Sequence, residues 1–205
     1  MAVYLGIDTS NYTTSAAAFD DVSGCVFQKK MLLPVKSGER GLRQSDAVFH
    51  HTQQLWQVVS AVIDECGKPD FIGASYAPRD AEGSYMPCFL AGVSAATAFS
   101  LSRALPLIEL THQQGHIAAA LYAAGDFTLF ERESLVFHVS GGTTDLLLCH
   151  GAERITPLGT SSDLYAGQAV DRLGVKLGYP FPAGVYVSEQ AALCTEKVRP
   201  KVSVH

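Results

Sequence analysis

Two histidines, His112 and His116, stand four residues apart in the segment THQQGH. On a helix, this spacing places both imidazole rings on one face, one turn apart. Two imidazoles so placed can hold Fe²⁺ or Zn²⁺ when a third ligand comes from elsewhere. The alternative is a pair of surface histidines without a metal, and spacing alone leaves both open. Gln113 occupies the place of the general-base glutamate of HExxH zinc proteases, which makes a metallopeptidase the weakest interpretation.

A second candidate site is the tip of a hairpin at Phe137–Cys149, FHVSGGTTDLLLC. Two apolar runs joined by a polar tip with glycines predict two paired strands. Backbone N–H groups around Ser140, Gly141 and Gly142 could bind a phosphate. The alternative is a tight turn that needs glycine only for a positive φ. Because Val3–Phe19 repeats the pattern, the sequence predicts a clamp of two hairpins around an anion.

Two carboxylates accompany these segments. Asp8 ends the first expected strand, where it could orient a metal-bound water or a phosphate, or cap the first tip. Asp171 lies in GQAVDRLG on an expected helix, where it could accept hydrogen bonds from ribose hydroxyls. A local pair with Arg172 is the alternative for Asp171, and by itself the sequence favours that alternative.

The elements that must position these residues follow from periodicity and turn residues. Expected strands are 4–7, 14–19, 25–33, 71–76 and 107–110, and expected helices are 45–66, 87–104 and 111–125. Ser45-Asp46 is expected to cap the first helix, and Thr111 with Gln114 to form a capping box on the third.

After a polar link, Asp126–Ser134, the pattern restarts with two hairpin strands and a third strand near Glu153–Leu158. A helix over about Ser162–Leu177 and a short helical run at Ser188–Cys194 complete the expected elements. The restart predicts an α/β fold of duplicated lobes, residues 1–125 and 126–205. The second lobe does not finish the pattern. Either this lobe is abbreviated or the chain is the N-terminal part of a longer protein, and we expect the second.

Composition restricts the function classes. The 205 residues are 47% hydrophobic and 17% charged, with a net charge of −5, which argues against coating nucleic acid by charge alone. An RNA held by a local patch or by a partner stays open. No apolar run approaches the ~20 residues of a membrane span. Five cysteines without a CxxC pair indicate reduced thiols and a cytoplasmic location rather than a disulfide framework.

Five motifs in order resemble one family, the TsaD tRNA threonylcarbamoyladenosine synthases, formerly called O-sialoglycoprotein endopeptidases. The motifs are LGIDTS at 5–10, THQQGH at 111–116, VSGGTT at 139–144, AGQAVDRLGVKLG at 166–178 and YPFPAG at 179–184. The resemblance implies the actin-like ATPase fold of sugar kinases, Hsp70 and actin. It also implies that His112 and His116 bind iron. The positions that it assigns to the adenylate or nucleotide part of the substrate are His138, Val139, Ser140, Gly141, Gly142, Asp171 and Gly184.

The implied reaction transfers a threonylcarbamoyl group from threonylcarbamoyl-AMP to N6 of adenosine 37 in tRNA. The implied cofactors are one Fe²⁺ or Zn²⁺ per subunit and an ATP- or AMP-type nucleotide, with Asp8 as a catalytic candidate. The implied partner is a related actin-like subunit, in a homo- or heterodimer.

This chain departs from the family in its first tip, Asn11-Tyr12-Thr13, which is usually acidic, and at Thr143 and Leu164, which replace a histidine and an aspartate. The family's third metal ligand, an aspartate, lies in a C-terminal segment beyond this chain. The alternative function is a non-catalytic nucleotide-binding or scaffold relative, like the TsaB partner subunit.

Overall fold

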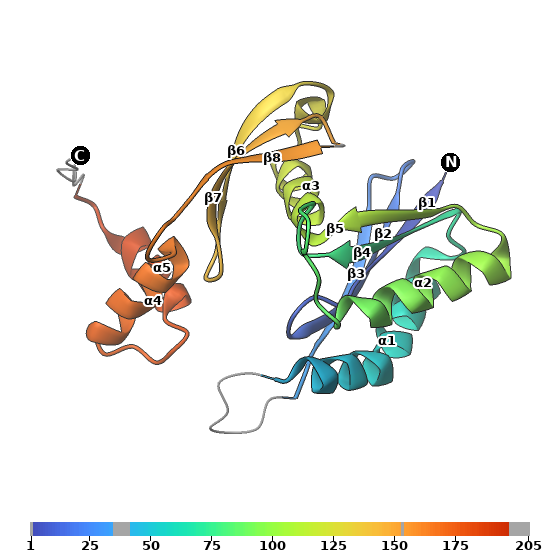
Figure 1. Cartoon of the computed structure of the whole chain (residues 1–205), viewed down its shortest axis with the longest axis horizontal. Coiled ribbons are helices and arrows are strands. Elements are labelled where there is room, and N and C mark those ends of the chain that lie inside the picture. Colours follow the sequence, from blue (N-terminus) through green and yellow to red (C-terminus); the bar gives the residue numbers. More distant parts are fainter. Residues whose placement is uncertain (1, 35–41, 153, 197–205) are drawn as a thin grey trace. The chain divides into compact units, whose positions relative to one another are not determined.

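A computed structural model describes residues 2–34, 42–152 and 154–196 (Figure 1). The chain forms two compact units, Met1–Phe127 and Thr128–His205. The division expected at residues 125 and 126 falls two residues before this point. Glu153, where the third strand of the second lobe was expected to begin, lies outside the described residues. No helix in the described part of the chain is long and apolar enough to span a bilayer.

The first unit has the expected order of three strands, a helix, a strand, a helix, a strand and a helix. Its elements are β1 (Val3–Asp8), β2 (Thr13–Asp20), β3 (Val26–Leu32), α1 (Gln44–Cys66), β4 (Phe71–Ala77), α2 (Phe89–Arg103), β5 (Leu107–Thr111) and α3 (His112–Ala124). The strands form one sheet in the order β3-β2-β1-β4-β5. β2 is antiparallel to both of its neighbours, whereas β4 is parallel to β1 and β5 to β4. The expected fold class, α/β with an actin-like lobe, is confirmed.

Helices α1 and α2 lie side by side against the sheet (Figure 1). Beneath them, alternate residues of β1 are buried, Leu5 being 1% and Ile7 4% exposed. Val58 and Val62 of α1 and Ala96 of α2 complete this core. Burying a large aliphatic side chain contributes about 1.5–3 kcal/mol, so this layer is the main source of stability in the first unit.

The start of α3 determines where His112 lies on that helix. The capping box expected on α3 is confirmed, because Thr111 Oγ1 accepts from Gln114 N and Gln114 Oε1 accepts from Thr111 N. His112 is therefore the first residue of α3. The cap expected at Ser45-Asp46 is wrong: α1 begins at Gln44 after Arg43, which makes no side-chain capping bond.

The second unit is a hairpin sheet followed by two helices. Its elements are the 3₁₀ turn η1 (Thr128–Glu131), β6 (Glu133–Val139), β7 (Thr144–His150), β8 (Arg154–Thr160), α4 (Ala166–Lys176) and α5 (Gly184–Leu193). All three strands are antiparallel to their neighbours, in the order β6-β7-β8. The link expected at 126–134 thus contains a 3₁₀ turn and the start of β6.

Both helix predictions in the second unit need correction. The helix expected over 162–177 begins at Ala166, because Ser161 Oγ bonds Leu164 O and holds the preceding residues in a turn. The run expected at 188–194 begins four residues earlier, at Gly184. Its first turn is capped by a side chain distant in sequence, the Asp171 carboxylate, and local pattern does not reveal such a cap.

Candidate functional site

Asp8 lies at the carboxyl end of β1, beside the carboxyl ends of the parallel strands β4 and β5. Its Oδ2 accepts hydrogen bonds from His112 Nδ1 at 2.7 Å and from Ser75 Oγ at 2.8 Å. Its Oδ1 accepts from the backbone N–H of Ser10 at 2.7 Å. Both carboxylate oxygens are therefore engaged, by groups from β4, α3 and the first tip.

The charge of Asp8 is stabilised by these partners. Burial by itself would raise the pKa of this carboxyl. The hydrogen bond and the charge of His112, together with the bonds from Ser10, outweigh burial and hold the pKa well below its usual range. Asp8 is thus an anion, and an ionised carboxylate can only accept hydrogen bonds, so Nδ1 of His112 carries a hydrogen.

The second nitrogen of His112 faces the other histidine. His112 Nε2 and His116 Nε2 lie 2.8 Å apart, and the two rings meet edge to face with centroids 4.3 Å apart. Phe89, which is buried at the start of α2, packs edge-on against the His112 ring. With Nδ1 protonated, the Nε2 of His112 is an acceptor only when the ring is neutral, and in that form it can receive the Nε2 hydrogen of His116.

This donor set fits a metal ion in part. Two nitrogens bound to one ion at about 2.0–2.1 Å each lie roughly 3 Å apart, close to the separation of the two Nε2 atoms. A carboxylate on the far nitrogen of a ligating histidine is the usual outer partner that fixes the ring and its tautomer. Among the described residues no third histidine, cysteine or carboxylate joins the pair, and Asp8 faces Nδ1 rather than Nε2.

The first hairpin tip is held from inside the unit rather than left open. Thr9 is buried, and its Oγ1 donates to Cys88 O and accepts from Gly92 N. Thr14 is also buried and bonds the ring of His51 on α1 at 2.8 Å. Burial of His51 lowers the pKa of its imidazole, so this ring favours its neutral form. These threonine hydroxyls fix the tip to α1 and α2, and phosphate binding is not needed to explain them.

The second tip is held by hydrogen bonds between Ser140 and its neighbours in the turn. Ser140 Oγ accepts from the N–H groups of Gly142 and Thr143, and Ser140 N donates to Thr143 O. Two of the N–H groups expected to face a phosphate are thus occupied. The alternative explanation for the glycines, a tight turn that needs a positive φ, does not hold, because neither Gly141 nor Gly142 has a positive φ. A Cβ at either position would stand in open space, so no described neighbour requires glycine at either position.

Helix α4 begins against this tip. Gly167 N donates to Ser140 O at 3.1 Å, and a Cβ on Gly167 would lie 2.6 Å from Gly141 N, so only glycine allows this approach. A hollow of about 980 Å³ extends from Gly141 along α4. Its lining combines the charged groups of Arg172 and Lys176 with the apolar side chains Leu164, Leu173, Val175 and Phe181.

Asp171 lines the same hollow but has a structural role as well. Its Oδ1 accepts from Ala183 N at 2.8 Å and from Gly184 N at 3.0 Å, which caps α5. The pair with Arg172 considered from the sequence is replaced by this cap, and Oδ1 is the only carboxylate oxygen that it engages. His138 lies on β6, with Nδ1 3.5 Å from Thr143 Oγ1, and Val139 next to it is more than half exposed.

The site residues therefore fall into two groups. Asp8, His112 and His116 meet in the first unit, and the tip, Asp171 and Gly184 meet in the second. Sequence reasoning missed Ser75 and His51, which stand 67 and 37 residues from the side chains that they bond. A polar residue on an otherwise apolar strand or helix face was the only available signal for either.

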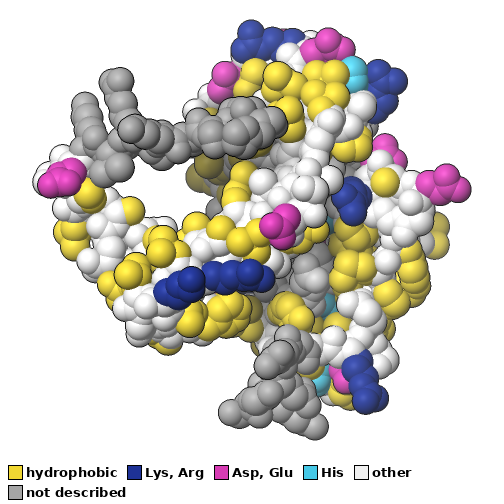
Figure 2. All heavy atoms as spheres, turned by 60° about the vertical axis from the view of Figure 1, so that its left-hand side comes forward, with side chains coloured by type: hydrophobic (Ala, Val, Ile, Leu, Met, Phe, Trp, Pro, Cys, Tyr) yellow, Lys and Arg dark blue, Asp and Glu magenta, His cyan; other side chains and the backbone are white. Residues whose placement is uncertain are grey.

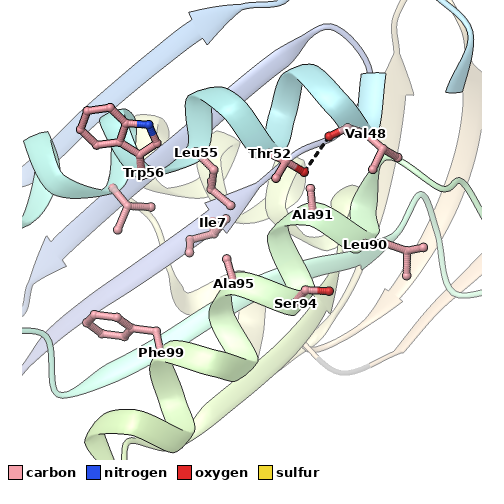
Figure 3. A pocket seen from close by; sticks show the side chains of 11 residues that line it. Ile7, Val48, Thr52, Leu55, Trp56, Leu90, Ala91, Ser94, Ala95 and Phe99 are labelled. Carbon is pink, nitrogen blue, oxygen red and sulfur yellow. Dashed lines mark hydrogen bonds between the residues drawn. The ribbon is translucent and has the colours of Figure 1, made fainter. Parts of the chain in front are cut away.

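A separate apolar groove lies between α1 and α2 (Figure 3). It measures about 540 Å³, and Leu55, Trp56, Leu90 and Phe99 are among its lining residues. Trp56, the only tryptophan of the chain, is 68% exposed, which is a high exposed fraction for so large an aromatic side chain.

Comparison with known proteins gives consistent matches. The family model described as tRNA N6-adenosine threonylcarbamoyltransferase, TsaD, matches residues 36–204. Two curated relatives with that name, from Lactiplantibacillus plantarum and Lacticaseibacillus casei, are 32% and 30% identical and are matched over 91% and 92% of this chain. The chain spans about half the length of these relatives, 53% and 54%.

Among solved structures, YeaZ from Pseudomonas aeruginosa matches with a TM-score of 0.48 and 15% identity, over 82% of this chain and 68% of its own. The ethanolamine utilization protein EutJ from Carboxydothermus hydrogenoformans matches with a TM-score of 0.49 and 16% identity, over 92% of this chain and 62% of its own.

Proposed function

The chain belongs to the TsaD family, as its motifs indicated, and from this premise we propose that it takes part in transferring a threonylcarbamoyl group from threonylcarbamoyl-AMP to N6 of adenosine 37 in tRNA. The observation that carries the proposal is the Asp8–His112–His116 arrangement. A carboxylate, a protonated Nδ1 and two facing Nε2 atoms form a preorganised half of a metal site. A pair of surface histidines has no need of an ionised, largely buried carboxylate behind it.

In this proposal Asp8 is a positioning residue rather than a group that touches substrate. It holds the His112 ring through Nδ1 and leaves Nε2 as the lone-pair donor, while Ser75 and Ser10 hold Asp8 itself. His112 and His116 would hold Fe²⁺ or Zn²⁺, with a third ligand from outside the described residues. The ion, when bound, would polarise the carbamoyl carbonyl and phosphate oxygens as a Lewis acid.

The second unit supplies the proposed adenylate site. Open space at Gly141 and Gly142 lets the backbone approach the ligand, and Arg172 and Lys176 offer positive charge for the phosphate. The apolar part of the hollow suits the adenine ring. Asp171 Oδ2 is the carboxylate oxygen proposed for ribose hydroxyls, because Oδ1 caps α5.

A reconstituted transfer assay tests this function. The chain is incubated anaerobically with Fe²⁺, threonylcarbamoyl-AMP and tRNA, and digested tRNA is examined for modified adenosine by mass spectrometry. We expect product that is lost in His112→Ala, and that is retained in His50→Ala as the matched control on α1. Because the chain spans half of its relatives, the assay is repeated with their C-terminal segment added. Absence of product in both arrangements would contradict the proposal.

A second candidate function is non-catalytic nucleotide binding, as in a scaffold subunit. It is favoured by the lack of a third metal-ligating side chain among the described residues and by the change to Thr143, whose hydroxyl bonds Ser140 rather than facing outward. Isothermal titration with AMP separates the two candidates. The scaffold function is supported if AMP binds with the same affinity with and without metal, and also in His112→Ala, while no transfer activity is detected.

The proposed partner is a related actin-like subunit that packs on α1 and α2. The support is the apolar groove of Figure 3, whose lining includes Trp56 at 68% and Leu90 at 48% exposed. A Trp56→Asp change should abolish association of the chain with this partner subunit, as measured by light scattering. The proposed location is the cytoplasm, because all five cysteines are free thiols, as expected of a reducing compartment.

A further inference from the structure

A carboxylate, an imidazole and a hydroxyl meet on the three strands of the second unit, at the end of the hairpin opposite to the Ser140 tip. Glu133 begins β6, His150 ends β7, and Thr156 lies near the start of β8. Glu133 Oε1 and His150 Nδ1 are 2.6 Å apart, and His150 Nε2 lies 3.2 Å from Thr156 Oγ1. Neither the proposed metal site nor the proposed adenylate site uses these three residues.

The strand register brings these side chains to one face of the sheet. Glu133 stands directly opposite His150 in the β6–β7 pair, and Arg154 stands opposite His150 in the β7–β8 pair. Thr156 is two residues beyond Arg154 on β8, so it shares the face of Arg154 and is the diagonal neighbour of His150. Leu148 is paired with Thr156 and therefore lies on this face as well.

The two hydrogen bonds of His150 have a defined direction. An ionised carboxylate only accepts hydrogen bonds, so Glu133 accepts the hydrogen of His150 Nδ1. Nε2 of the neutral ring then has no hydrogen, and it accepts the hydrogen of the Thr156 hydroxyl. A hydroxyl that donates to an imidazole, which in turn is oriented by a carboxylate, is the arrangement that activates nucleophilic hydroxyls in hydrolases.

A small molecule can reach this group from solvent. The side chain of Glu133 is 69% exposed and that of His150 is 21% exposed. Leu135 and Phe137, on the same face of β6 as Glu133, are 66% and 73% exposed and offer apolar surface near the hydroxyl. Apolar side chains also make up much of the surface displayed in Figure 2. The surroundings suit a substrate that joins an apolar acyl or aryl group to a reactive carbonyl.

We propose that Thr156 is a nucleophile for acyl transfer from small activated esters, with His150 as its general base. Thr156 Oγ1 attacks the carbonyl carbon and forms a new C–O bond, while its proton passes to His150 Nε2. The bond to the leaving alcohol then breaks, and the leaving oxygen takes this proton from His150. The product is an O-acyl threonine, from which water releases the acid by the same two steps.

Two neighbours assist the hydroxyl and the base. Glu133 is a positioning residue, because it acts through His150 and holds the ring in the Nδ1–H tautomer. Arg154 supplies positive charge on the same face, where the carbonyl oxygen of the ester becomes an oxyanion during the attack.

Reaction with p-nitrophenyl acetate tests the proposal. The full 205-residue chain is incubated with this ester, p-nitrophenolate release is followed by absorbance, and acetylated residues are located by peptide mass spectrometry. We expect an acetyl group on Thr156, or turnover that depends on it. Thr52, whose hydroxyl on α1 donates to the carbonyl of Val48, should stay unlabelled. Thr156→Val should abolish the reaction at this site, and Thr156→Ser should retain it.

The neighbours of the hydroxyl are tested one at a time. His150→Gln should slow the reaction of Thr156 by roughly 100-fold or more, as for the loss of a general base. His50→Gln, the matched change on α1, should leave it unchanged, and Arg154→Gln should slow it by a smaller factor. Glu133→Gln should slow acetylation without changing the unfolding midpoint, and NMR of the imidazole nitrogens should show that His150 no longer prefers the Nδ1–H tautomer.

Circular dichroism of each variant confirms that it is folded, and the comparison of Thr156 with Thr52 needs no variant. The proposal is overturned when Thr156 is neither acetylated nor needed for p-nitrophenolate release, or when Thr52 reacts as fast as Thr156. It is equally overturned when His150→Gln and His50→Gln react at the same rate. None of these outcomes depends on metal, nucleotide or tRNA, so the proposed function is tested separately.

Discussion

Each unit begins with an antiparallel hairpin that has one apolar face, but this face is buried in the first unit and exposed along β6 in the second. Leu5 and Ile7 of β1 are 1% and 4% exposed, whereas Phe137 and Val139 of β6 are 73% and 54% exposed. The hairpins do not explain this difference, since both are antiparallel pairs with an apolar face. The two sheets differ in the helices that cover them. Helices α1 and α2 pack on the first sheet, whereas neither described helix of the second unit, α4 or α5, packs on the exposed face of β6.

The tips differ in the same way. Thr9 and Thr14 of the first tip are buried and bonded to α2 and α1, so the first tip is part of the core. Ser140 of the second tip bonds only the tip itself and the start of α4. The first unit thus holds a hydrogen-bonded Asp8–His112–His116 arrangement, whereas the second unit leaves the tip and one face of β6 exposed.

The largest difference in unfolding free energy is expected between a change in the core of the first unit and a change on the exposed face of β6. Leu5→Ala should lower the free energy of unfolding by about 2–5 kcal/mol, because it leaves a cavity beneath α1 and α2. Phe137→Ala should change it by less than about 0.5 kcal/mol, as for other exposed positions. Urea unfolding followed by circular dichroism measures both. Equal destabilisation by the two changes would show that the β6 face is covered in the isolated chain.

A smaller contrast is expected between the tips. Thr9→Val leaves Gly92 N and Cys88 O without their hydroxyl partner in a buried place, at a cost of about 1–3 kcal/mol. Ser140→Ala removes a partner from N–H groups that water can reach, so less than about 1 kcal/mol is expected. The same urea experiment compares them, and a larger loss for Ser140→Ala would contradict the assignment of the first tip to the core.

A still smaller effect concerns pH. Burial lowers the pKa of His51 in the folded chain, so below pH 6.5 the unfolded chain binds a proton that the folded chain resists. Stability of the first unit should therefore fall as the pH decreases from 7 to 5, and the loss should level off below the folded-state pKa. His51→Gln should reduce this pH dependence, while His50→Gln on the same helix should retain it. Unchanged pH dependence in His51→Gln would remove His51 as its cause.

Local patterns predicted the elements well and the site in part. The capping box at Thr111 involves residues three apart, and it correctly placed His112 at the start of α3. The cap of α5 comes from Asp171, which stands twelve and thirteen residues before the two N–H groups that it accepts, and local sequence pattern does not reveal this contact. The roles of Ser75 and His51 depend on tertiary partners, and the motifs gave no sign of Asp8 acting through His112.

The family itself was recognised from motif order, and the family model confirms it. The glycines of the second tip illustrate the limit of such reasoning. A positive φ was the obvious alternative explanation for Gly141 and Gly142, but the backbone has none there. Only coordinates distinguish a glycine required by a turn from a glycine that leaves space.

Anaerobic equilibrium dialysis with Fe²⁺, followed by metal analysis, tests the central claim most directly. We expect about one ion per chain and none in His112→Ala or His116→Ala. In Asp8→Asn, which loses the carboxylate behind His112, we expect an affinity roughly 10–100-fold weaker. A chain that binds no metal, or one whose binding is the same in wild type and His112→Ala, would contradict it.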